Sequence, residues 1–158
     1  MNSRQSARRR LLGLTAGAAA LAALSPLARA ARGPLVQVWK SPTCGCCKDW
    51  IALLEKDGFT VKTFDEGNTA ARQRAGIPLK LGSCHTALVG GYAVEGHVPV
   101  RDIRRLLAEK PDAVGITVPG MPIGSPGMDG REYGGRKDPY DVLLVLKDGS
   151  TRIWSSYR

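Results

Sequence analysis

The chain has few cysteines, four in 158 residues, which is too few for a disulfide-dense mini-protein. It also has no internal repeat and no low-complexity run beyond an alanine-rich N-terminus. Hydrophobic residues make up 43% and charged residues 23% of the sequence, close to the average of globular proteins. These observations exclude a collagen-like chain, a coiled coil and a disordered chain. The length then predicts one domain of ordinary size.

Acidic residues are absent from the first thirty positions, which carry five arginines. Without this segment the formal net charge falls from +9 to +4. The remaining sequence has no stripe of lysine or arginine interleaved with aromatic residues, which a nucleic-acid-binding surface would need. We therefore expect no nucleic acid among the partners.

Charge is also absent from residues 11–28, a run of 18 positions rich in alanine, leucine and glycine. Arg8-Arg9-Arg10 precedes the run, and Ala28-Arg29-Ala30 is an A-x-A cleavage signal at its end. This three-part pattern predicts a signal peptide over residues 1–30. The Arg-Arg-x-Leu-Leu arrangement is similar to a twin-arginine signal, whose substrates cross the membrane already folded.

A membrane anchor is the alternative interpretation of the same segment, because 18 residues lie at the lower limit for spanning a bilayer. Ser25, Pro26 and several glycines make the run only weakly apolar, so we favour cleavage. The mature chain, residues 31–158, is then expected outside the cytoplasm, without stable insertion in the membrane.

The rest of the sequence predicts alternating strands and helices. Cys47, Ile51 and Leu54 are spaced three or four positions apart, which predicts a helix over 44–56, with Thr43 as its N-cap. In chain order, the patterns predict a strand at 35–39, a helix at 44–56, a strand at 59–64, a short helix at 68–75, a hairpin at 86–94, a helix at 99–108, a Pro/Gly-rich loop at 111–139 and a hairpin at 140–154. This order resembles the thioredoxin architecture. We expect an α/β, thioredoxin-like single domain with a Gly/Pro/Met loop and a C-terminal β-hairpin.

Three of the four cysteines lie within four positions, Cys44-Gly45-Cys46-Cys47, after the first predicted strand. A thioredoxin-like fold carries its redox motif at this place, where the positive end of the helix dipole favours thiolate over thiol. Cys84 comes forty residues after Cys44, just before the next hairpin strand. The loop that enters this strand lies against the redox motif in such folds, so we expect the four sulfurs to converge.

Four clustered sulfurs are compatible with several chemistries. A thiol–disulfide oxidoreductase would need only Cys44 and Cys47, which have C-x-x-C spacing; it remains an alternative. Zinc would take four sulfurs, but adjacent Cys46 and Cys47 do not easily bind one tetrahedral ion, and the spacing matches no usual iron–sulfur pattern. A structural disulfide or zinc site is a third hypothesis. Cu(I) accepts two or three thiolates that bridge between ions, so the packing of thiols favours a Cu(I)–thiolate site that holds more than one ion.

Methionine and histidine side chains outside the cysteine motifs are further candidate ligands for a metal. Both methionines of the mature chain, Met121 and Met128, lie in a Gly/Pro loop; thioethers bind Cu(I), although methionines also pack under loops. His97 precedes a predicted helix, where it either makes structural hydrogen bonds or serves a metal. His85 has less weight, because strand alternation would point it to the face opposite Cys84.

Four motifs in order resemble the CopG-like family, formerly known as a domain of unknown function with predicted metal binding. They are Cys44-Gly45-Cys46-Cys47, Gly82-Ser83-Cys84-His85-Thr86, Glu95-Gly96-His97-Val98-Pro99 and Pro119-Gly120-Met121-Pro122-x-Gly124-Ser125-Pro126-Gly127-Met128. The resemblance spans residues 36–154 and implies a thioredoxin-like fold, export to the periplasm and a role in copper resistance. It also implies a cysteine-bridged cluster of several copper ions, with Cu(I)/Cu(II) interconversion.

The ligand set that we predict is accordingly Cys44, Cys46, Cys47, Cys84, Met121, Met128 and His97. The expected partners are copper ions and other periplasmic copper-handling proteins, although no sequence feature identifies a particular partner protein. The resemblance leaves open whether the members of the family turn over a substrate.

Overall fold

A computed structural model describes residues 33–158; the predicted signal peptide, residues 1–30, lies outside the described residues. The strands are β1 (Leu35–Lys40), β2 (Thr60–Phe64), β3 (His85–Val89), β4 (Tyr92–Glu95), β5 (Gly115–Thr117), β6 (Tyr140–Val145) and β7 (Thr151–Tyr157). The helices are α1 (Gly45–Lys56), α2 (Thr69–Arg74) and α3 (Val100–Glu109), with 3-10 turns η1 (Leu79–Leu81) and η2 (Arg131–Tyr133). None of the described helices is long and apolar enough to cross a membrane.

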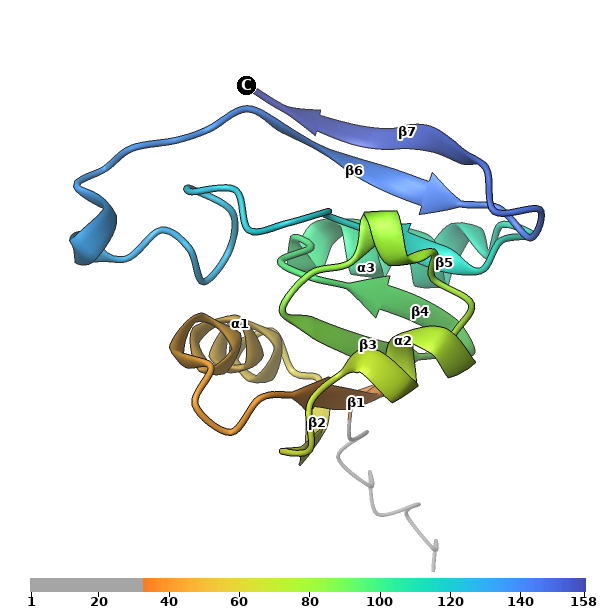
Figure 1. The fold of residues 1–158 in the computed structure, drawn as a ribbon, viewed down its shortest axis with the longest axis horizontal. Helices are drawn as coiled ribbons and strands as arrows, with labels where there is room; N and C mark the ends of the chain where they lie inside the picture. The colour runs from red at the N-terminus through yellow and green to blue at the C-terminus, as the bar shows by residue number, and fades with distance from the viewer. Residues whose placement is uncertain (1–32) are drawn as a thin grey trace, which may run out of the picture.

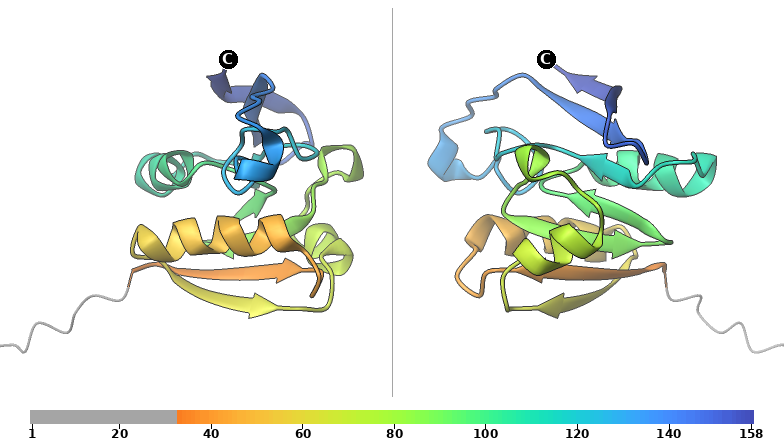
Figure 2. Two further views of the ribbon diagram at one scale, coloured as in Figure 1. Left: turned by 90° about the vertical axis from the view of Figure 1, so that its left-hand side faces the viewer. Right: turned by 45° about the vertical axis from the view of Figure 1, so that its right-hand side comes forward.

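The seven strands within residues 33–158 form one sheet in the order β2-β1-β3-β4-β5-β6-β7 (Figure 1). β1 runs parallel to β2 and antiparallel to β3, and β3 runs antiparallel to β4. Figure 2 shows β2 and β7 at the opposite edges of the sheet. The predicted mixed α/β class is confirmed. The thioredoxin-like assignment within this class remains an interpretation, which the order and directions of β1 to β4 support.

The two faces of the sheet carry separate sets of buried side chains. One face packs against α1 and α3, whose Leu54 and Ile103 belong to the same core. The other face packs against η1 through Leu81. Neighbouring residues of β4 divide between the two, because Val94 joins the first core and Ala93 the second. The α2–η1 segment lies in front of the strands in Figure 1 and α3 lies behind them.

Helix α1 begins one residue later than the predicted cap implies. Its N-cap is Cys44 and not Thr43, because the backbone N–H of Cys44 closes a turn on the Ser41 carbonyl at 3.1 Å. The Trp50 indole donates a hydrogen bond to the Val98 carbonyl at 2.8 Å and ties the buried face of the helix to the segment before α3. The cysteine motif therefore occupies the N-cap and first turn, where backbone N–H groups lack helical partners.

The prediction of one long loop over 111–139 is wrong in part, because β5 and η2 lie within it. β5 pairs with β4 in parallel and with β6 antiparallel, and so joins the C-terminal hairpin to the sheet. A Cβ atom on Gly115 would lie 1.9 Å from the Ala93 carbonyl oxygen, so this strand needs glycine for its close approach to β4. A strand of three residues is too short to show an alternating pattern.

Candidate metal centre

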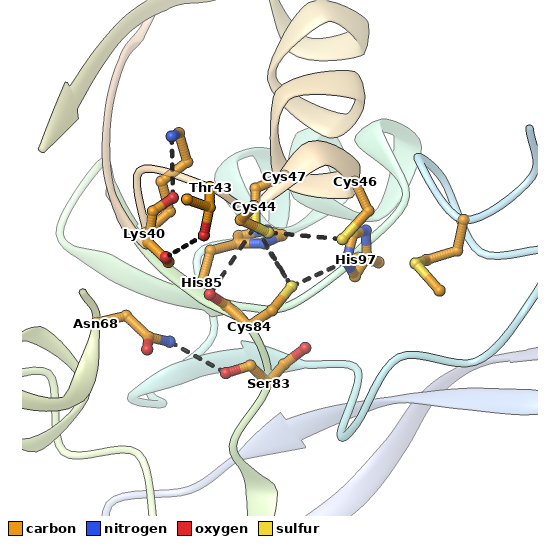
Figure 3. The surroundings of a disulfide bond; sticks show 12 residues. Lys40, Thr43, Cys44, Cys46, Cys47, Asn68, Ser83, Cys84, His85 and His97 are labelled. Atoms are coloured by element: carbon orange, nitrogen blue, oxygen red, sulfur yellow. Dashed lines mark hydrogen bonds between the residues drawn. A yellow bond between two sulfur atoms is a disulfide. The ribbon is translucent and has the colours of Figure 1, made fainter. Parts of the chain in front are cut away.

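The four cysteines come together from two places in the sequence, the start of α1 and the loop that enters β3 (Figure 3). The Sγ atoms of Cys44, Cys46, Cys47 and Cys84 all lie within 4.8 Å of one another. We call these four residues the cysteine cluster. The predicted convergence is confirmed, because the antiparallel pairing of β1 with β3 brings the end of one strand to the start of the other.

Within the cluster, Cys44 and Cys47 form a disulfide, and Cys46 and Cys84 are free. The Cys46 sulfur lies 3.6 Å from that of Cys44, and the Cys84 sulfur lies 3.5 Å from that of Cys47. Each free thiol is therefore in contact with one end of the disulfide. In this oxidised state the cluster has two thiols, and reduction of the Cys44–Cys47 disulfide gives four.

His97 faces the cluster with one ring nitrogen and is held by the other. Its Nε2 lies 3.0 Å from the Cys84 Sγ, and its Nδ1 lies 2.8 Å from the Pro126 carbonyl oxygen. A carbonyl only accepts hydrogen bonds, so Nδ1 carries the proton and donates it. Burial lowers the pKa of His97, so the ring is neutral and Nε2 presents a lone pair to Cys84.

His85 also lies at the cluster, and the expectation that it points to the opposite face is wrong. Its Nδ1 is 3.3 Å from the Cys84 Sγ, and its ring centroid is 4.9 Å from that of His97. The side chain is fully buried, which lowers its pKa well below the ordinary value. Alternation did not apply because Cys84 precedes the strand. The sequence signal that could have placed His85 at the cluster is its position directly after Cys84.

Burial disfavours the thiolate form of Cys84 when no metal is bound. Burial, with the Cys46 thiol as its neighbour, raises the pKa of Cys84 to about 12. Its polar contacts include the two neutral imidazoles and a sulfur. A metal cation that binds this sulfur therefore displaces a proton from it.

The loop of residues 119–128, which we call the methionine loop, packs against the first turn of α1. Gly127 has a φ of +82°, and a Cβ atom there would lie 2.7 Å from the Cys46 carbonyl oxygen. Met128 is buried, and its sulfur accepts a hydrogen bond from the Tyr133 hydroxyl at 3.4 Å. Met121 is 52% exposed. The structure thus places the loop beside the cysteines, while the role of both thioethers as ligands remains a prediction.

This site defines a class of protein. A mixed α/β domain that gathers four sulfurs and two imidazoles at one helix N-terminus has the donor set of a soft-metal or thiol-redox centre. The family described as "Protein of unknown function, DUF411" matches residues 81–128, which include Cys84, both histidines and the methionine loop. No curated protein matches the chain.

Two solved structures identify the family more closely. The structure described as copper resistance protein CopG, form 2, is 43% identical, covers 80% of this chain and 99% of its own, and has a TM-score of 0.74. Form 1 of the same protein is 44% identical, covers 78% of this chain and 96% of its own, and has a TM-score of 0.72. The chain belongs to the CopG family of copper resistance proteins.

Proposed function

We propose that this protein binds Cu(I) in a cysteine-bridged cluster of several ions and serves copper resistance in the periplasm. The observation that carries the proposal is the convergence of four cysteine sulfurs within 4.8 Å. Relatives described as copper resistance proteins support copper as the metal. Export rests on the signal pattern of residues 1–30.

The spacing of the sulfurs suits shared ions. Metal–sulfur bonds are about 2.3 Å long, as in zinc sites, so sulfurs 3.5 and 3.6 Å apart can bind one ion together or bridge two. The Cys46 sulfur lies beside that of Cys44, and the Cys47 sulfur, which is bonded to Cys44 here, lies beside that of Cys84. Soft thiolates at these separations suit Cu(I) ions that share sulfurs.

The proposed ligands are Cys44, Cys46, Cys47, Cys84, His97, Met121 and Met128. Reduction of the Cys44–Cys47 disulfide precedes full loading, because a disulfide sulfur has no thiolate charge to offer. The Pro126 carbonyl fixes the tautomer of His97, so that the lone pair of Nε2 is available to bind a metal ion. Cu(I)/Cu(II) interconversion extends the proposal, and a reversible redox wave of the loaded protein would test this extension.

An anaerobic Cu(I) titration of the reduced protein against a chromophoric chelator tests the proposal. We expect more than one copper per chain, and fewer in Cys46→Ser, which lacks one free sulfur of the cluster. Ala52→Ser, on an exposed position of α1, is the control and should keep the full load. One copper or none in the reduced wild type would refute the proposal.

A thiol–disulfide oxidoreductase is the second candidate, and the disulfide itself favours it. Cys44 is partly exposed at the helix N-terminus and Cys47 is fully buried, as expected of a nucleophile and a resolving thiol. The Cys44 thiolate would attack a substrate disulfide, and Cys47 would release the mixed disulfide by forming the bond seen here. Insulin reduction tests this candidate, and inactivity with and without copper would exclude it.

A further inference from the structure

The residue that precedes Cys84 is held at each of its polar groups. The Ser83 backbone N–H donates to Glu95 Oε1 at 2.7 Å. Its carbonyl accepts hydrogen bonds from the Arg72 guanidinium at 2.5 Å and from the Asn68 amide at 3.1 Å. Its hydroxyl donates to the Gly120 carbonyl in the methionine loop. The peptide before Cys84 is thus fixed to α2, to β4 and to the loop at once.

Glu95 is the centre of this network and is fully buried. Its Oε1 also accepts from Arg72 Nε at 2.8 Å, and its Oε2 accepts from the Thr86 hydroxyl at 2.5 Å. One carboxylate therefore holds the residues on both sides of the Cys84–His85 pair. Glu95 is the last residue of β4, two positions before His97, so the same side chain links the segment of Cys84 to that of His97.

Gly82 and Gly96 show how closely the backbone packs against Arg72 and Ser83 in this hydrogen-bond network. A Cβ atom on Gly82 would lie 2.8 Å from the Arg72 guanidinium carbon. A Cβ atom on Gly96, which has a φ of +74°, would lie 2.5 Å from the Ser83 hydroxyl. Neither position leaves room for a side chain, so the segments of Cys84 and His97 pack closely around the network.

We infer that Arg72 and Glu95 are positioning residues of the proposed copper centre, which hold Cys84 Sγ and His97 Nε2 at their separation of 3.0 Å before metal arrives. The inference rests on the proposed function. Within the described residues, neither Arg72 nor Glu95 is among the cysteine and histidine side chains that could hold a metal. Both act through the backbone and hydroxyls of the Ser83–Thr86 segment. A buried ion pair adds little stability over an apolar pair of similar size, so the geometry it imposes is its main effect.

The principal test compares Glu95→Gln with wild type in the reduced protein. The amide loses the charge and one acceptor oxygen. We expect the same copper stoichiometry, a Cu(I) affinity lower by about ten- to hundred-fold, the range for loss of an outer-shell partner, and a weaker copper–nitrogen signal from His97 in X-ray absorption. Arg104→Gln, which breaks the half-exposed pair with Asp57, is the matched control and should leave both readouts unchanged.

Conservative substitution separates positioning from folding. Arg72→Lys keeps the charge but not the planar fork, so it should bind Cu(I) more tightly than Arg72→Met and less tightly than wild type. Folded Glu95→Gln and Arg72→Met proteins with wild-type affinity and nitrogen signal would overturn the inference.

Hydrogen exchange of the Ser83 amide tests the inference in the wild-type protein, so this test does not depend on whether a variant folds. If the pair orders the site in advance, the Ser83 amide is as protected without copper as with it. Rapid exchange in the metal-free protein that slows only on copper binding would also overturn the inference. A wild type that binds no copper but keeps this protection would instead count against the proposed function alone.

Discussion

His97 Nε2 lies 3.0 Å from Cys84 Sγ, while the opposite ring nitrogen donates to the Pro126 carbonyl. One imidazole therefore connects the β3 entry loop, the segment after β4 and the methionine loop. Because the carbonyl fixes the tautomer, the unprotonated nitrogen is the one that faces sulfur. His97 therefore presents an unprotonated nitrogen that could bind a metal ion beside Cys84. Its two contacts also link the methionine loop to the cysteine cluster.

Replacement of His97 should weaken copper binding without removing the cluster. His97→Gln loses the ring nitrogen beside Cys84, while the four sulfurs remain. We expect Cu(I) affinity to fall by at least about tenfold, the lower end of the loss for removal of a mere partner of a ligand, with more than one copper still bound, in a chelator competition. Wild-type affinity in a folded variant would show that the imidazole is not a ligand and does not orient one.

The redox state of the Cys44–Cys47 pair should set the copper capacity. The disulfide removes two of the four thiolates, so the oxidised protein offers only Cys46 and Cys84. We expect fewer copper ions per chain in the oxidised protein than in the reduced one, measured by anaerobic titration before and after treatment with a reductant that is then removed. Equal loading in both states would contradict the assignment of Cys44 and Cys47 as ligands.

Gly127→Ala should push the methionine loop away from α1. The residue has a φ of +82°, and an added Cβ would meet the Cys46 carbonyl at 2.7 Å. A non-glycine residue in this backbone conformation costs about 1–3 kcal/mol, and the contact adds to it. Denaturant unfolding measures the loss. Gly120→Ala is the matched control, because Gly120 has a similar φ of +70° but open space around it; an equal loss in both variants would refute the packing argument.

The C-terminal strand should loosen at alkaline pH. Tyr157 donates a hydrogen bond to buried Asp102, and burial together with this carboxylate raises the pKa of Tyr157 above its ordinary value of 10.0. An acid whose pKa is higher in the folded state stabilises that state below its unfolded pKa. This contribution is lost as the pH rises from about 10 through the folded value.

Unfolding measured above pH 10 should therefore show a steeper loss of stability in wild type than in Tyr157→Phe. Ala52→Ser, on an exposed position of α1 without a titratable group, is the control and should follow the wild-type slope. Parallel curves for wild type and Tyr157→Phe would exclude this phenol as the source of the pH dependence.

Local patterns were enough to predict most of the fold. The spacing of Cys47, Ile51 and Leu54 predicts α1, and glycine turns mark both hairpins, because these signals depend on residues a few positions apart. β5 was missed because three residues form a strand only when β4 and β6 lie on either side of them. Thr43 was predicted as the cap because it has the right side chain, but the Ser41–Cys44 turn moves the N-cap to Cys44 and the first helical residue to Gly45.

The sequence by itself determined which sulfurs meet, since a cysteine motif at a helix start and a cysteine before an adjacent strand can converge through strand pairing alone. Only the tertiary structure decided which polar groups surround them. The Pro126 carbonyl on His97 and the Arg72–Glu95 pair join residues from separate segments. Such contacts depend on the directions of side chains after the sheet, helices and loops have packed, and no short-range pattern in the chain encodes those directions.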